Sequence, residues 1–196
     1  MYPFNHKMGQ KIQTDAPGVN VDRTFLAHLA ISAADAIAAS NTAVLAAQTL
    51  ATGTTTNIVT GITNQSIPRC LRIVGNQAGI NGNVVITGTD YGGNVITETI
   101  TANGTTPVDG NKAFKTITGI LLPQRNAAGD TISVGFNEKL GLPYKLPHNT
   151  VRDAYLNNIK ESTTPTVAVS ATALESNTIK LNSTLNGSVV DIYLVV

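Results

Sequence analysis

Residues 83–122 read NVVITGTDYGGNVITETITANGTTPVDGNKAFKTITGILL, and this stretch decides the expected fold of the chain. Asn83–Tyr91 and Asn94–Ala102 are rich in Val, Ile and Thr, the residues that suit a pleated, half-buried strand. Between them lies Gly92-Gly93, a pair that tolerates the positive φ of a tight hairpin turn. A loop and a third strand, Phe114–Leu122, follow. The stretch predicts an antiparallel β-hairpin with a further strand behind it.

The register of this hairpin follows from the side chains that it can bury together. A two-residue loop at Gly92-Gly93 would place Ile86 and Ile100 on opposite faces, whereas a three-residue loop over Tyr91–Gly93 pairs the residues on either side of it, Asp90 and Asn94. The longer loop gathers one face of Val84, Ile86, Ile96 and Ile100, and leaves Val85, Thr87, Thr97 and Thr99 on the other. Because a one-residue slip exchanges the two faces of a strand, we predict the three-residue loop. Glu98 falls on the apolar face, so we expect it near a sheet edge or beside a cation.

Composition narrows the class of protein. The chain has 196 residues, which is enough for one large β domain or two small ones. Only 13% of the residues are charged, against roughly 25% in an average domain, and Thr and Asn supply much of the polar surface instead. The net charge of +1 gives no electrostatic case for nucleic acid or an anionic membrane as a partner. A surface with few charges suits packing into a dense assembly.

The N-terminal part of the chain carries the weakest fold signals. Residues 1–24 mix Pro, Gly, Asn and isolated charges without periodicity, which indicates an extended arm or a disordered terminus. MYPFNHKMGQ lacks an apolar run, so we expect no secretory signal and synthesis in a cytoplasm. Residues 25–51 are rich in Ala, which favours helix; Ser32 with Asp35 fits a helix N-cap. We expect a short helix or loop to about Ala39 and a strand over Ala43–Leu50.

From Thr54 onward, strand signals recur at the short intervals expected of a sandwich or barrel. The further candidates are Thr56–Ile62, Arg69–Gly75, Thr131–Asn137, Val151–Ile159, Thr166–Ala171, Thr178–Asn182 and Ser188–Val196. The last of these alternates clearly, so we expect it to be a core strand. Dipeptides such as Asn103-Gly104 and Asp109-Gly110 are interpreted as turns between strands.

Glu138–Thr150 connects two of these strands and contains Pro143 and Pro147, which exclude a regular strand. Its apolar residues still alternate with others, so we expect an ordered, extended crossover whose apolar groups lie on another surface. Those residues are Leu140, Leu142, Tyr144 and Leu146.

The sequence contains no motif that indicates a catalytic, metal-binding or nucleotide-binding site. His6, His28 and His148 are scattered, and no H-E-x-x-H motif, Cys/His cluster, phosphate-binding loop or nucleophile elbow occurs. Asp90 and Asn94 around a Gly pair resemble a calcium loop only loosely, and turn chemistry explains both residues. Lone Cys70 is interpreted as a small buried hydrophobe. Lys139, Lys145, His148 and Arg152 form a modest basic cluster, which either faces acidic groups of a partner or is solvated. We therefore expect no enzyme, no cofactor and no metal.

Several segments together resemble a family of tailed-bacteriophage virion proteins, the head decoration or cement proteins. These segments are GITNQSIPRCLRI, VVITGTDYGGNVITETI, GNKAFKTITGILLP, EKLGLPYKLPHNTV and SATALESNTIKLNSTLNGSVVDIYLVV, within residues 58–196. The resemblance implies a subunit that binds the outer surface of a phage capsid and stabilises it, with the major capsid protein and copies of itself as partners. A tail, head–tail adaptor or fibre component, and a host- or carbohydrate-binding β module, are the alternatives.

These observations combine into one expectation. The fold is mainly β, an antiparallel β-sandwich of jelly-roll or immunoglobulin-like type, with an N-terminal arm and a short helix or loop over residues 1–40 and the sandwich over residues 41–196. Neither nucleic acid nor membrane is expected as a partner. The expected interface residues are the large apolar groups of the arm and of the crossover. They are Tyr2, Phe4, Phe25, Leu140, Leu142, Tyr144 and Leu146.

Overall fold

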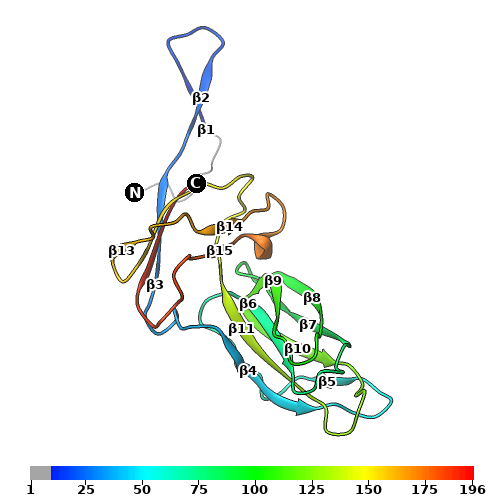
Figure 1. Cartoon of the computed structure of the whole chain (residues 1–196). Helices are drawn as coiled ribbons and strands as arrows, with labels where there is room; N and C mark the ends of the chain where they lie inside the picture. Colours follow the sequence, from blue (N-terminus) through cyan, green and yellow to red (C-terminus); the bar gives the residue numbers. More distant parts are fainter. Residues whose placement is uncertain (1–9) are drawn as a thin grey trace.

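The structure, a computed structural model, describes residues 10–196 and is mainly β, with antiparallel sheets and one 3-10 helix, η1 (Leu174–Ser176) (Figure 1). The predicted sandwich class is confirmed. The buried apolar side chains of the described chain fall into two clusters, one in a lower body and one in an upper body as Figure 1 is drawn.

The lower body is a sandwich of two sheets around the first cluster. One sheet has four strands in the order β5 (Thr56–Ile58), β10 (Thr116–Leu122), β7 (Asn83–Thr89) and β8 (Val95–Thr101). The facing sheet contains β4 (Ser40–Thr49), β11 (Thr131–Gly141), β6 (Arg69–Gly75) and β9 (Val108–Phe114). Ile86 and Ile120 from the first sheet and Ile73, Val134 and Phe136 from the second are all fully buried in this core.

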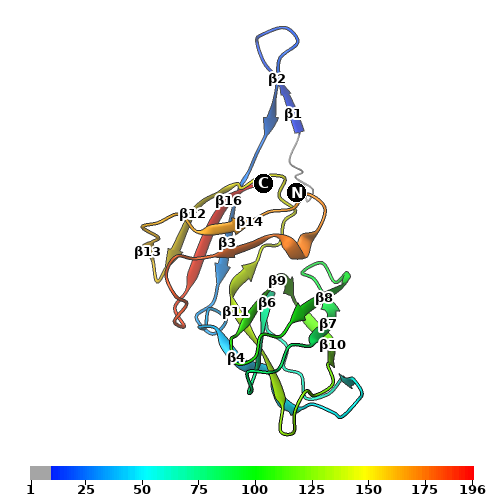
Figure 2. The ribbon, with the colours of Figure 1, turned by 45° about the vertical axis from the view of Figure 1, so that its right-hand side comes forward.

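The upper body is built on the end of the same long strand. Leu140 and Gly141 of β11 pair with β15 (Thr178–Lys180), which pairs in turn with β14 (Thr166–Ala168). A four-stranded sheet covers the second cluster, in the order β13 (Ile159–Lys160), β12 (Val151–Leu156), β16 (Val190–Val195) and β3 (Leu26–Ile31) (Figure 2). Because β11 contributes Phe136 to the lower core and Leu140 to the upper one, this strand joins the two bodies.

The central hairpin has the predicted register. Thr89 pairs with Val95, and Asp90 donates its N–H to the Asn94 carbonyl at 3.0 Å, which leaves Tyr91–Gly93 as the three-residue loop. The buried Asp90 carboxylate accepts hydrogen bonds from the N–H groups of Gly92 and Asn94, and Gly93 supplies a φ of 82°. The four predicted core residues, Val84, Ile86, Ile96 and Ile100, are buried, and Thr87 and Thr97 are more exposed.

Residues 25–39, predicted as a short helix or loop, contain no helix: the first part is a strand, and only residues 32–39 are a loop. Leu26–Ile31 forms strand β3, whose Leu29 pairs with Ile192 of β16, so tertiary pairing overrides the helix propensity of the alanines. The expected Ser32–Asp35 contact is present, with the Ser32 hydroxyl donating to the Asp35 carboxylate at 2.7 Å, but it closes a turn between strands.

The interpretation of Asp109-Gly110 as a turn is also wrong, because both residues lie inside strand β9. A Cβ on Gly110 would lie 2.6 Å from Oε2 of Glu98, so this position is glycine because a neighbouring side chain occupies the space. A turn that was missed lies at Asn157 and Asn158, which have φ of 52° and 61° and connect β12 to β13.

Candidate interaction surfaces

The N-terminal arm is a two-stranded hairpin that extends away from the upper body (Figures 1 and 2). Strand β1 (Gln10–Gln13) pairs with β2 (Asn20–Arg23), and β2 leads directly into the edge strand β3. Thr14 locks the tip: its hydroxyl donates to the Val19 carbonyl at 2.7 Å and accepts from the Ala16 N–H at 3.2 Å. The tip therefore has a defined shape and presents exposed Ala16, Pro17 and Val19 to the surroundings.

Of the predicted interface residues in the arm, Tyr2 and Phe4 lie outside the described residues. Phe25 is half-buried at the base of the hairpin, and its backbone exchanges two 2.8 Å hydrogen bonds with that of Val196. Phe25 thus fastens the start of β3 to the last residue of the chain.

The three leucines predicted as interface residues are core residues instead. Leu140, Leu142 and Leu146 are at most 1% exposed and belong to the second cluster, so in this fold they cannot contact a partner. Tyr144, between them, is 37% exposed. The predicted crossover over Glu138–Thr150 is wrong for its first four residues, because β11 continues to Gly141 and Leu140 pairs with Ile179. After Gly141 the chain is the expected non-strand connection, and its apolar groups are laid on the upper body of the same chain.

Asn177 holds this crossover in place from within the upper body. Its fully buried side chain accepts hydrogen bonds from the Leu146 and Ser170 N–H groups at 3.0 and 2.8 Å. The amide donates to the carbonyls of Ser170 and Ala173 at 2.9 and 2.8 Å. All the polar capacity of Asn177 is thus used inside the fold.

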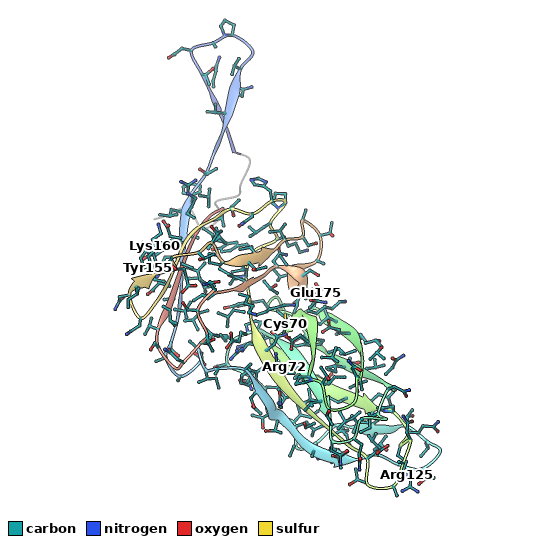
Figure 3. The ribbon with its side chains drawn as sticks, viewed as in Figure 1. Cys70, Arg72, Arg125, Tyr155, Lys160 and Glu175 are labelled. Atoms are coloured by element: carbon teal, nitrogen blue, oxygen red, sulfur yellow. The ribbon has the colours of Figure 1, made fainter. Side chains whose placement is uncertain are left out.

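The outward face of the upper four-stranded sheet carries a cluster of aromatic side chains. His28 of β3 stacks on Tyr193 of β16 with ring centroids 4.6 Å apart, and its Nε2 lies 2.7 Å from Oδ1 of Asp191. Tyr155 of β12 meets Tyr193 edge-on at 5.8 Å, and Lys160 forms an ion pair with Asp153 beside it (Figure 3). These ring contacts join the outward side chains of three strands, β3, β16 and β12.

The outward face of the lower four-stranded sheet carries no charged side chain. Its residues come from alternate positions of β7, β8 and β10 and from the end of β5, and Glu98 and Asp90 point to the other side. A shallow hollow of about 460 Å³ lies across β5, β10 and β7 on this face. Its lining is Asn57, Val59, Val85, Thr87, Thr118, Gly119 and Leu121.

The predicted basic cluster is dispersed, and Lys145 is an exposed residue of the crossover. His148 and Arg152 line one hollow beside the end of β16. Lys139 lies at the junction of the bodies, where its ammonium donates to Oδ1 of Asn111 at 2.7 Å. The structure thus brings only two of the four residues, His148 and Arg152, to one hollow.

Glu98 lies on the edge strand β8, as expected for a charge on an apolar face. Its Oε1 accepts the backbone N–H groups of Asn111 and Lys112 at 2.6 and 3.2 Å, so the carboxylate satisfies the open edge of β9 in the facing sheet. Its Oε2 is buried without a hydrogen bond. Desolvation by burial outweighs the two N–H donors and the nearby Lys112 and Lys139 charges, and raises the pKa of Glu98.

This raised pKa gives a testable pH dependence. Between the ordinary pKa of 4.5 and the raised value, the folded protein binds more protons at Glu98 than the unfolded chain, so the free energy of unfolding decreases as the pH rises through this window. In Glu98→Gln an amide oxygen still accepts the two N–H groups, and no charge is buried. We expect the variant to match or exceed the wild type at neutral pH and to lose this part of the pH dependence in urea unfolding. A stability difference between the two proteins that is constant with pH would contradict this assignment.

Within the described residues, no group of three or more His, Cys, Asp or Glu side chains is arranged to hold a metal ion. No helix of the described chain is long and apolar enough to cross a membrane. Cys70 is fully buried, and desolvation raises the pKa of its thiol to about 12, so it is a packing residue rather than a nucleophile.

Comparison with known proteins adds no relative: no protein-family model, curated protein sequence or solved structure matches this chain.

Proposed function

We propose that this protein is a structural subunit of a bacteriophage virion that binds the outer surface of the capsid and stabilises it. The observation that carries the proposal is the β1–β2 hairpin, which extends beyond the body of the chain (Figure 1). A lone two-stranded hairpin is at best marginally stable in water. Contact with another molecule would supply the stabilisation that this hairpin does not obtain from a core of its own.

The composition and the surface support an assembly role. Residues 40–68 contain no charged side chain, and the outward sheet face of the lower body is uncharged as well. Such surfaces can associate without desolvating charged side chains. The uncharged surface and the hairpin would suit any assembly that buries them. The resemblance of residues 58–196 to phage virion proteins is the reason for proposing a phage capsid.

In this role the protein acts through its free energy of binding to the capsid, without a chemical reaction. A subunit that bridges neighbouring capsid proteins makes contacts only in the mature lattice, so it stabilises that lattice against internal pressure. For any such ligand, the stabilisation grows with the logarithm of its free concentration relative to its dissociation constant. Such a subunit needs a segment that extends far enough to contact a neighbouring capsid protein, and in this proposal the projecting β1–β2 hairpin is that segment.

Removal of residues 1–24 tests the proposal. Phe25 is kept in this truncation because its backbone pairs with Val196. We expect the melting temperature to stay nearly unchanged, since the deleted strands pair with each other, and binding to capsids of the encoding phage that lack this protein to be lost. The measurement is co-sedimentation with such capsids.

The matched control is Val95→Ser, which alters an apolar side chain that is 77% exposed on the lower body. This substitution leaves the N-terminal β1–β2 hairpin intact. Undiminished capsid binding by the truncated protein would overturn the hairpin as the anchor. If the full-length protein binds purified tails or fibres and not capsids, the protein is a tail, adaptor or fibre component instead.

A further inference from the structure

We propose that the hairpin tip of one copy docks into the hollow on the lower sheet of a second copy, the hollow lined by Val59, Val85, Gly119 and Leu121 among others. This inference rests on the proposed function in one respect, because it names one partner of the hairpin, a second copy of this chain.

The two surfaces lie at opposite ends of the molecule. The hairpin extends from the upper body, and β5 and β10, which carry the hollow, lie toward the far end of the lower body (Figure 1). The tip of a chain therefore cannot reach the hollow of the same chain. A contact between them has to join two copies head to tail, and such a contact continues from copy to copy into a ring or an open array.

The tip and the hollow have complementary polarity. Ala16, Pro17 and Val19 are exposed at the tip, with Val19 at 51%. The lining of the hollow consists only of apolar residues, threonines, an asparagine and a glycine, and Val59 is 61% exposed. Burying these valines against each other would remove apolar surface from water at both sites without desolvating a charge.

The glycine in the hollow leaves room for a partner. A Cβ at Gly119 would meet only Oδ1 of Asn57 at 3.5 Å and the Ile58 carbonyl at 4.0 Å, so this position is not glycine because of crowding within the chain. Gly119 lies at a bulge in β10, where the register against β7 shifts between Ile117 and Gly119, and its lack of a side chain leaves this part of the lining open to a partner.

The tip carries an acidic residue, and a basic residue follows a strand that lines the hollow. Asp15 is exposed at the hairpin tip. Arg125 follows β10 by three residues and lies at the far end of the lower body (Figure 3), and no ion pair is described for it within residues 10–196. Arg125 follows Leu121, which lines the hollow, by four residues, so an acidic tip seated in the hollow is expected to come near this arginine, and that attraction would orient the contact.

A disulfide-trapping experiment with two singly substituted proteins tests the contact. Val19→Cys places a thiol at the tip, and Val59→Cys places one in the hollow; Cys70 is fully buried and does not compete. When the two purified proteins, made with different tags, are mixed at high concentration under mild oxidation, we expect a mixed disulfide dimer. The matched control is Val19→Cys with Val95→Cys, since Val95 is exposed on the same sheet but outside the hollow, and it should give far less product.

Sedimentation velocity over a concentration series supplies the second measurement. Val19→Asp and Val59→Asp should each weaken self-association by about tenfold or more, because the contact would then bury an unpaired charge. Asp15→Arg should weaken it as well, and Asp15→Arg combined with Arg125→Asp should restore it. Equal trapping at Val59 and Val95, or self-association that Val59→Asp leaves unchanged, would overturn the inference.

The outcomes also separate this inference from the proposed function. If the cysteine pair fails to form a disulfide but removal of residues 1–24 still abolishes capsid binding, the hairpin docks on the capsid protein and the self-contact is wrong. If the disulfide forms and the truncated protein binds capsids normally, the self-contact stands and the hairpin is not the capsid anchor.

Discussion

Deletion of Ile192–Val196 is expected to prevent the upper body from folding. Strand β16 lies in the middle of its sheet and pairs with β12 on one side and β3 on the other. Ile192 and Leu194 are fully buried, and burial of each such side chain contributes about 1.5–3 kcal/mol. The deletion also leaves the backbone groups of two neighbouring strands without partners. The sum of these losses is comparable to the total free energy of unfolding of a domain, which is about 5–15 kcal/mol.

Circular dichroism and thermal melting of the purified truncation are the measurements. We expect poor soluble yield and loss of the cooperative transition of the upper body. Val195→Thr is the matched control, since this side chain is only half-buried on the outward face and the strand pairing is kept, and it should shift the unfolding free energy by less than about 1 kcal/mol. A soluble truncation with an unchanged melt would contradict the central place of β16.

The features that the sequence revealed are those encoded by neighbouring residues. The hairpin over residues 83–101 has its alternation, its turn glycines and its Asp90 within one short segment, so burial fixes the register. The last strand was visible for the same reason, since Val190, Ile192 and Leu194 alternate with outward residues.

The features that the sequence concealed depend on distant partners. Leu26–Ile31 has helix-like composition, and only pairing with β16, some 163 residues away, makes it a strand. Gly110 resembles a turn residue until Glu98 from the other sheet is placed over it. Leu140, Leu142 and Leu146 were recognised as apolar groups that need a cover, but alternation alone cannot tell whether that cover is the same chain or another.

The candidate surfaces follow the same division. Residues 1–24 lack periodicity, which pointed to an arm, whereas the hollow needs the mutual register of β5, β10 and β7 and could not be read from any one of them. The His28–Tyr193–Tyr155 cluster likewise joins three strands from separate parts of the chain.

Arg69 is expected to be the most sensitive charged residue of the described chain. It is 1% exposed at the start of β6, where the two bodies meet. Its guanidinium donates to the carbonyl of Ile37, in the link from β3 to β4, at 2.8 Å, and to that of Asn137, in β11, at 2.6 Å. It also lies 4.1 Å from the centroid of the Phe136 ring. Burial lowers the pKa of Arg69 to about 10, which still leaves it charged at neutral pH.

Arg69→Ala should therefore lower the free energy of unfolding by about 3–5 kcal/mol, because it leaves a cavity and removes the donor from the buried Asn137 carbonyl and from the part-buried Ile37 carbonyl. Arg69→Met keeps most of the packing and loses only the donors, so it should fall between the alanine variant and the wild type. Arg72→Met, on the same strand, removes a half-exposed ion pair with Asp109 and should cost less than about 1 kcal/mol. Urea unfolding of the three variants followed by circular dichroism gives the order. If Arg69→Ala cost no more than Arg72→Met, the two bodies would be held together by β11 and the apolar cores alone, with Arg69 contributing nothing measurable to the junction.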